Sequence, residues 1–127
     1  MNQEITSIFP SEKRRLIGFD IGSVSLNTVV MDESHNVIEN YYEYIHGKPF
    51  NVLRSRLASI LENHPAESIS GIAITGTGGK LATDLIGGIF VNEIIAQATS
   101  TCQLYPDAQT VIEIGGEDSK LIFLEKD

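Results

Sequence analysis

Two short glycine turns, each preceded by an acid, contain the residue types of this chain that best suit chemistry. Residues 20–23 read Asp-Ile-Gly-Ser, and residues 113–118 read Glu-Ile-Gly-Gly-Glu-Asp. Glycine lets backbone N–H groups point into a concavity without a Cβ atom in the way, and many proteins hold phosphate oxygens by this means. We therefore predict two phosphate-binding turns, with candidate contacts at Gly22, Ser23, Ser25, Gly115, Gly116, Asp118 and Ser119.

A third glycine loop and a strand-end acid extend this interpretation. Residues 76–80, Gly-Thr-Gly-Gly-Lys, follow a run of β-branched residues, so Thr75, Gly76 and Gly78 are predicted to form a third face of the same cleft. Asp20 comes at the end of an apolar run, and carboxylate and water oxygens are the ligands that Mg²⁺ prefers. We predict that Asp20 holds Mg²⁺ through the water shell of the ion.

Each turn taken alone has a simpler explanation, because a tight hairpin needs glycine for a positive φ whether or not it binds a ligand. Three such loops, each at the end of a predicted strand, favour phosphate binding. The chain contains neither the G-x-x-x-x-G-K-[ST] pattern of a P-loop nor the G-x-G-x-x-G pattern of a dinucleotide fold. A phosphate site of another architecture is therefore predicted.

The elements that position these loops follow from the apolar pattern. The first apolar run, residues 16–21, is nearly continuous and predicts a strand buried on both faces. Apolar residues at helical spacing, after Pro49 and after the N-capping residue Asn92, predict helices. The expected strands are residues 16–21, 26–31, 37–45, 69–75, 89–91, 110–114 and 121–124, and the expected helices are 49–63, 81–85 and 92–105.

This order predicts an α/β fold whose mixed sheet begins with three antiparallel strands and continues with parallel strands and helices. The strand, acid, glycine turn and second strand of residues 16–31 recur at residues 111–124, which indicates two lobes that open with the same hairpin. We expect a loose tail at residues 1–13, a first lobe at 14–105, and at 106–127 the opening hairpin of a truncated second lobe.

The composition excludes some classes of function. A net charge of −8 and an isoelectric point near 4.7 argue against a nucleic-acid partner, which needs a basic surface. No apolar run is as long as a membrane helix or has the form of a secretory signal, so we expect a cytoplasmic protein without a membrane partner. The single cysteine, Cys102, cannot form an intrachain disulfide or a metal site by itself, and we expect it to be a small buried core residue.

Four blocks of sequence resemble, in order and spacing, the motifs of a known family. They are residues 19–23 (Phe-Asp-Ile-Gly-Ser), 75–78 (Thr-Gly-Thr-Gly), 92–94 (Asn-Glu-Ile) and 113–120 (Glu-Ile-Gly-Gly-Glu-Asp-Ser-Lys). The family is that of the BadF/BadG/BcrA/BcrD-type ATPases, which includes the activators of 2-hydroxyacyl-CoA dehydratases and the ATPase subunits of benzoyl-CoA reductases. It lies within the superfamily of actin, sugar kinases and heat-shock chaperones. The resemblance implies that the predicted lobe is the ribonuclease H-like lobe of the actin-like ATPase fold.

The resemblance also implies an activity. Proteins of this family are dimeric ATPases with one [4Fe–4S] cluster between the subunits, and they use ATP and Mg²⁺ to drive an electron into a partner acyl-CoA dehydratase or reductase. The cluster cysteines of the family lie beyond the second glycine turn, so the cluster is expected only in the complete protein. By this resemblance the chain is the N-terminal, ATP- and Mg²⁺-binding portion of a CoA-substrate-specific enzyme activase, and it is inactive alone.

Residue roles carry over from the family motifs position by position. The resemblance implies that Asp20 is a ligand of magnesium-bound water, and that Glu113, where the family usually has Asp, keeps a carboxylate for the metal. Glu117 stands where the family usually has Gln, which orients the attacking water. Its extra negative charge beside a triphosphate leaves open whether the chain hydrolyses ATP. The implied phosphate-lining residues are Gly22, Ser23, Gly115 and Gly116, flanked by Thr75, Gly76 and Gly78.

Two alternatives for the function stay open: a lobe of an amino-sugar kinase of the same superfamily, and a non-catalytic actin-like module that serves as an interaction surface. Glu93 is either functional or a carboxylate that complements the helix dipole. Lys80 and Lys120 either contact phosphate or are surface lysines. The residues predicted to be surface histidines are His35, His46 and His64.

Overall fold

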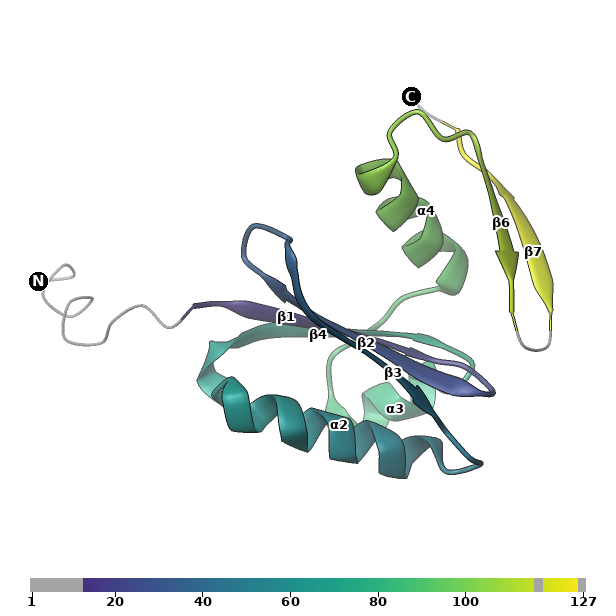
Figure 1. The fold of residues 1–127 in the computed structure, drawn as a ribbon. Coiled ribbons are helices and arrows are strands. Elements are labelled where there is room, and N and C mark those ends of the chain that lie inside the picture. The colour runs from purple at the N-terminus through teal and green to yellow at the C-terminus, as the bar shows by residue number, and fades with distance from the viewer. Residues whose placement is uncertain (1–12, 116–117, 126–127) are drawn as a thin grey trace, which may run out of the picture.

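A mixed β-sheet forms the centre of the computed structural model, which describes residues 13–115 and 118–125 (Figure 1). Strands β1, β2 and β3 form an antiparallel meander, and β4 and β5 extend the sheet in parallel to β1, giving the spatial order β3-β2-β1-β4-β5. The predicted antiparallel strands followed by parallel strands are confirmed. The bounds are β1 (Arg15–Ile21), β2 (Ser25–Asp32), β3 (Val37–Tyr44), β4 (Ile69–Gly76) and β5 (Ile89–Phe90).

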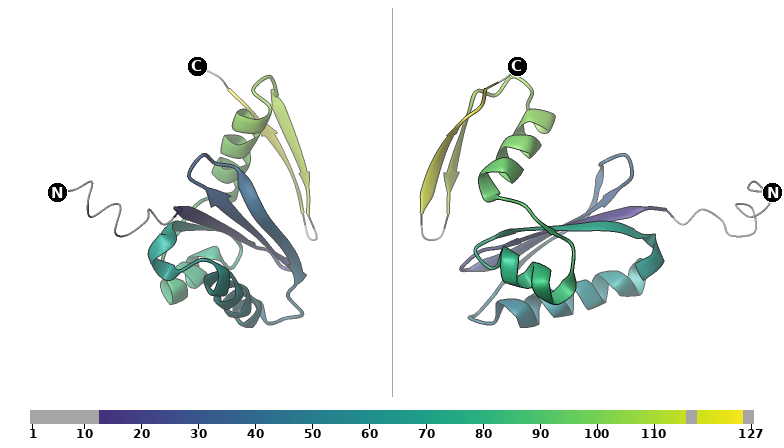
Figure 2. Two further views of the ribbon diagram at one scale, coloured as in Figure 1. Left: turned by 60° about the vertical axis from the view of Figure 1, so that its left-hand side comes forward. Right: turned by 180° about the vertical axis from the view of Figure 1, so that it is seen from behind.

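Helices α2 (Pro49–Asn63) and α3 (Gly79–Ile86) cover one face of this sheet (Figures 1 and 2). Pro49 occupies the first turn of α2, where its missing N–H removes no hydrogen bond. A short 3₁₀ turn, Ala66–Ser68, joins α2 to β4. Successive side chains of a strand face opposite sides, so alternate residues of the sheet point toward the helices. The core between the layers consists of Ile17, Phe19, Ile21, Leu26, Val30, Ile45, Leu53, Ile60, Ile74 and Ala82.

Helix α4 (Glu93–Leu104) stands over the opposite face of the sheet (Figure 1). Strands β6 (Thr110–Ile114) and β7 (Ser119–Phe123) form a separate antiparallel pair beside α4, which we call the C-terminal hairpin (Figure 2). The side chain of Asn92 accepts a hydrogen bond from the backbone N–H of Ile94 at 2.8 Å, which confirms the predicted N-cap. None of the helices in the described ranges combines the length and the apolar run that crossing a bilayer requires.

Three expectations about packing are wrong, because the second face of the sheet is only partly covered. Strand β1 was expected to be buried on both faces, but only alternate residues are buried, and the residues between them face a cavity. Helix α4 was expected to bury its apolar face, yet Ile94 and Ile95 are 48% and 60% exposed. For the same reason Cys102, predicted to be a buried core residue, is only half-buried.

A polar network joins the edge strand β3 to α2. Arg56 donates from Nε and Nη2 to the two carboxylate oxygens of Glu43, each at 2.9 Å, and its guanidinium lies 3.7 Å from the centroid of the Tyr41 ring. The Tyr41 hydroxyl donates to Glu39, whose carboxylate also contacts Nε2 of His64. The prediction of a surface histidine is therefore wrong for His64, whose side chain is only 14% exposed, because the fold brings distant partners to it.

Thr28 is a core position at which we expect a substitution to stabilise the fold. It lies in β2, is 1% exposed, and its Oγ1 has no hydrogen-bond partner within the described residues. A buried hydroxyl without a partner costs about 1–3 kcal/mol, and valine has nearly the same shape without that hydroxyl. Thr28→Val is therefore expected to raise the free energy of unfolding by about 1 kcal/mol, as measured by urea denaturation.

Thr110→Val is the matched control, because Thr110 is an exposed strand threonine. Its effect on the free energy of unfolding is expected to stay within about 0.5 kcal/mol. A Thr28→Val variant that is no more stable than the wild type would show that the buried hydroxyl finds a partner in solution.

Candidate functional site

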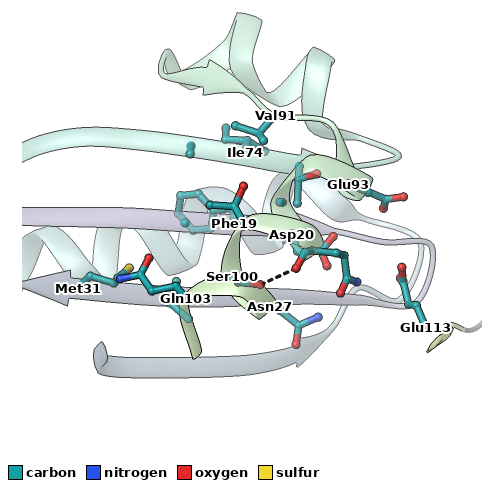
Figure 3. Close-up of a pocket in the computed structure, with 17 residues that line it drawn as sticks. Phe19, Asp20, Asn27, Met31, Ile74, Val91, Glu93, Ser100, Gln103 and Glu113 are labelled. Atoms are coloured by element: carbon teal, nitrogen blue, oxygen red, sulfur yellow. Dashed lines mark hydrogen bonds between the residues drawn. The ribbon is translucent and has the colours of Figure 1, made fainter. Parts of the chain in front are cut away.

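A cavity of about 530 Å³ lies between α4 and the face of the sheet that α2 and α3 leave uncovered (Figure 3). Strands β1, β2 and β4 supply its floor, through residues that alternate with the core positions. Helix α4 supplies a wall through side chains that include Glu93, Ala96, Gln97 and Ser100. The floor includes Gly18, Asp20, Asn27, Val29, Ala73 and Thr75.

One end of this cavity is polar. Asp20 lies near the end of β1, and the register of the parallel pair places Thr75 of β4 directly beside it. Glu113 enters from β6, and Glu93 begins α4. Figure 3 shows the carboxylates of Asp20, Glu93 and Glu113 at the same end. Asp20, Thr75 and Glu113, which come from three separate segments of the sequence, therefore line one cavity.

The polar end carries an excess of negative charge. Burial raises the pKa of Asp20 first, the nearby Glu93 and Glu113 raise it further, and Lys120 opposes them. Lys120 donates from Nζ to Oε2 of Glu93 at 2.6 Å, and this hydrogen bond is the main reason that the pKa of Lys120 is raised. Three carboxylates thus share one ammonium group, an arrangement that favours binding of a further cation.

Two oxygen atoms at this end are buried without a partner. Oγ1 of Thr75 and Oε2 of Glu113 have no hydrogen-bond partner among the residues that the structure describes. Buried side-chain oxygens are normally hydrogen-bonded, and an unpaired one calls for an explanation such as a bound ion or water. Both oxygens belong to predicted site residues, and both can accept a hydrogen bond or contribute to a cation's surroundings.

The two glycine turns close in the same way. The backbone N–H of Gly22 donates to the carbonyl oxygen of Ser25 at 3.0 Å, and the N–H of Gly115 donates to the carbonyl oxygen of Asp118 at 2.8 Å. In each turn the N–H of the glycine that follows the strand donates to the carbonyl oxygen of the residue three positions later. The internal repeat that the sequence indicates therefore extends to this hydrogen bond.

The third glycine loop packs directly against the end of β1. Gly76 has a φ of +97°, and a Cβ atom at this position would lie 2.3 Å from the carbonyl oxygen of Ile21. The N–H of Gly78 donates to that same oxygen at 3.4 Å. Only glycine allows the β4–α3 loop to approach β1 this closely, so the loop is held next to the Asp20 turn.

The other predicted contacts lie in these turns rather than in the cavity lining. Ser23 is exposed. Gly116 and Glu117 lie outside the described residues, so their roles stay predictions. The sequence analysis missed Asn27, which lines the cavity and is the antiparallel partner of Asp20. The hairpin register and the two-residue period of strands were the signals that would have placed it there.

The residues present fit a magnesium nucleotide better than a metal held by protein side chains alone. Within the described ranges no three His, Cys, Asp or Glu side chains lie close enough to hold a metal ion together. This agrees with Mg²⁺, which keeps several waters and is usually held by one or two carboxylates and by phosphate oxygens. A [4Fe–4S] cluster does not fit this chain, because it needs four thiolate ligands and the chain has one cysteine.

A scan against models of protein families finds no match to this chain. Among curated proteins, the (R)-2-hydroxyglutaryl-CoA dehydratase activating ATPase of Acidaminococcus fermentans is 23% identical to it over 110 residues. The match covers 86% of this chain and 42% of that protein. The chain therefore spans less than half the length of the curated relative that it matches.

Two solved structures of dehydratase activators have a similar fold. The (R)-2-hydroxyglutaryl-CoA dehydratase component A of Acidaminococcus fermentans matches with a TM-score of 0.77 at 23% identity, over 88% of this chain and 43% of that one. The activator of the 2-hydroxyisocaproyl-CoA dehydratase from Clostridium difficile, with bound ADPNP, matches with a TM-score of 0.70 at 21% identity, over 87% and 41%. These matches confirm the predicted actin-like ATPase type of fold and the predicted resemblance.

A Ppx/GppA phosphatase of Aquifex aeolicus matches less well, with a TM-score of 0.50 at 13% identity, over 87% of this chain and 48% of that one. Proteins that share a fold often differ in activity, so the fold does not decide the function of this chain. The function has to be argued from the polar end of the cavity and from the turns beside it.

Proposed function

We propose that this chain is the nucleotide-binding portion of an ATPase that activates a 2-hydroxyacyl-CoA dehydratase or a related reductase. The observation that carries the proposal is the meeting of Asp20, Thr75 and Glu113 at one end of a cavity, together with two glycine turns that form the same backbone hydrogen bond. The similarity to dehydratase activators, one of them solved with bound ADPNP, supports ATP as the ligand.

In this proposal the backbone of the turns binds the phosphates, and the carboxylates orient the hydrated magnesium ion. Asp20 would accept hydrogen bonds from magnesium-bound water, and Glu113 would help to hold the same water shell. Bound magnesium would supply charge neutralisation for the phosphate oxygens. Thr75 orients a phosphate oxygen or a water through its unpaired hydroxyl. The backbone and hydroxyl contacts are assigned to Gly22, Ser23, Ser25, Gly76, Gly78, Gly115, Gly116 and Asp118.

Glu117 has a separate place in the proposal. We assign to it the orientation of the attacking water, in the position where the resembling family usually has Gln. A carboxylate beside a triphosphate is electrostatically unfavourable, so we expect hydrolysis to be slow without a partner.

The proposal includes a second lobe that begins at residue 106, after a first lobe at residues 14–105. The face of the C-terminal hairpin that points away from α4 is apolar and open: Ile112, Ile114, Leu121 and Phe123 are 71%, 84%, 57% and 73% exposed. Contiguous exposed apolar side chains mark a surface that another segment covers. In a polypeptide as long as the matched relatives, the chain that follows would cover this face and complete the nucleotide cleft.

The proposed partner is an acyl-CoA dehydratase or reductase, and the proposed location is the cytoplasm. A homodimer is part of the proposal only for the longer polypeptide. Any [4Fe–4S] cluster there would require cysteines other than Cys102, so no step of the proposed function of this chain passes through a cluster.

The test uses a polypeptide as long as the relatives and measures Mg·ATP binding by calorimetry and phosphate release with and without a dehydratase partner. We expect binding, slow release alone and faster release with the partner. Phosphate transfer to an amino sugar would instead support the kinase alternative. Binding without any release would support the non-catalytic module, and no binding would contradict the proposal. For the 127-residue chain alone we expect binding weaker than micromolar.

A further inference from the structure

The Glu93–Lys120 ion pair is a side-chain contact whose role the proposed function leaves unexplained. Nζ of Lys120 lies 2.6 Å from Oε2 of Glu93, and both side chains are about one-third exposed, at 28% and 33%. Within the described residues it is the side-chain hydrogen bond that joins the C-terminal hairpin to the rest of the fold. The pair therefore fixes the hairpin relative to the first turn of α4.

The ion pair lies near the turn end of the hairpin. Lys120 is the direct cross-strand partner of Glu113, and both lie next to the turn that begins at Gly115. Farther from this turn, the hairpin is anchored by apolar packing, because Ile122 is only 7% exposed. The hairpin thus has an apolar anchor at one end and a charged anchor at the end that carries the glycine turn.

The charged anchor lies at the polar end of the cavity. Glu93 and Glu113 both line the cavity with Asp20, and they stay together only while the hairpin is held against α4. Without the ion pair, the apolar contact and the connection between α4 and β6, which consists of residues 105–109, are what remain to hold the hairpin. Salt weakens a partly exposed ion pair, so this anchor can be released without unfolding the core.

We infer that Glu93 is a positioning residue that holds Glu113 at the polar end of the cavity, with Asp20, through its ion pair with Lys120. The inference deepens the proposed function, on which its significance for nucleotide binding rests. Glu93 does not need to touch the nucleotide for this role. It sets the distance across the cleft, and loss of either charge releases the turn end of the hairpin.

The test measures this distance directly, without nucleotide. Spin labels are placed on exposed positions, one on α2 at Glu62→Cys and one on the hairpin at Ile112→Cys, in a Cys102→Ser background. Pulsed dipolar spectroscopy then gives the distance distribution. We expect one narrow distance in the parent chain and, in Glu93→Gln and Lys120→Met, about a fivefold larger open population.

Lys120→Arg is the conservative rescue, because it keeps the positive charge within reach of Glu93, and it is expected to keep the narrow distance. Lys48→Met is the matched control, because Lys48 is an exposed lysine immediately before α2 that forms no ion pair within the described residues. High salt should broaden the distribution of the parent chain and leave that of Glu93→Gln unchanged.

A narrow distance in both Glu93→Gln and Lys120→Met would overturn the inference, and so would broadening in Lys120→Arg as large as in Lys120→Met. A separate titration of Mg·ATP into the longer polypeptide should show at most about twofold weaker binding for Glu93→Gln, because the affinity falls only as far as the closed population does. If the longer wild-type polypeptide binds no Mg·ATP, the proposed function fails, whereas the distance result still decides the ion-pair anchor by itself.

Discussion

Asp20→Asn is expected to make the fold more stable and to weaken nucleotide binding about 100-fold. The pKa of Asp20 is raised by burial and by Glu93 and Glu113, so the folded chain binds a proton at Asp20 more tightly than the unfolded chain does. Ionised Asp20 therefore opposes folding. Asparagine removes this charge and keeps the size, and we expect the free energy of unfolding at pH 7 to rise by about 0.5–2 kcal/mol.

The pH dependence of this gain has a definite sign. A raised folded pKa contributes stability below the unfolded pKa, and this contribution is lost as the pH rises through the folded pKa. The stability difference between Asp20→Asn and the wild type should therefore be largest above the folded pKa of Asp20 and should shrink as the pH falls toward the ordinary carboxyl value of 3.8. Urea denaturation of both proteins over a series of pH values measures this stability difference.

The same substitution removes the charge that the proposed site uses. We expect Mg·ATP to bind the longer polypeptide about 100-fold more weakly, since hydrogen bonds to a charged group contribute about 1.5–3 kcal/mol each. Asp84→Asn is the control, because Asp84 is an exposed acid on α3. Neither its stability nor its binding should change. Undiminished binding in Asp20→Asn would contradict the magnesium role.

Gly76→Ala is expected to have the largest effect on stability, a loss of about 3 kcal/mol or more, because two penalties combine. The φ of +97° is strained for any residue with a side chain, and the added Cβ would lie 2.3 Å from the carbonyl oxygen of Ile21 and 2.7 Å from Oδ1 of Asp20. Strand β1 is central in the sheet, so its backbone cannot move away.

Gly47→Ala separates the two penalties. Gly47 also has a positive φ, +74°, but a Cβ atom there would meet nothing within 4 Å. Only the backbone strain remains, and we expect a loss of about 1–2 kcal/mol. Thermal or urea unfolding of both variants measures the difference. Equal losses in Gly47→Ala and Gly76→Ala would show that the loop can retreat from β1.

Much of the fold could be predicted because the local signals agree with one another. The apolar runs predicted the strands, Pro49 predicted the start of α2, and Asn92 predicted the N-cap of α4. The residues at the polar end of the site could also be predicted, because an acid or a hydroxyl residue is the next-to-last residue of each of the strands β1, β4 and β6. These features depend on residues close together in the sequence.

The features that could not be predicted depend on tertiary packing. The apolar spacing of α4 indicated that Ile94 and Ile95 face the core, but the helix turns Glu93, Ala96 and Gln97 toward the sheet instead. Likewise, no local pattern could pair Lys120 with Glu93, 27 positions earlier. Which side of a helix is covered depends on the layer opposite it, and the single-sequence pattern does not contain that information.

The most direct test of the central claim, a magnesium nucleotide site at the ends of β1, β4 and β6, is to map amide chemical-shift changes by NMR. The ¹⁵N-labelled chain is titrated with Mg·ADPNP, and weak binding still displaces the resonances. We predict that the largest shifts occur at Gly22, Ser23, Ser25, Gly76, Gly78 and Gly115. Shifts confined to the inner cavity around Met31 and Gln103, or no shifts at millimolar nucleotide, would contradict the account.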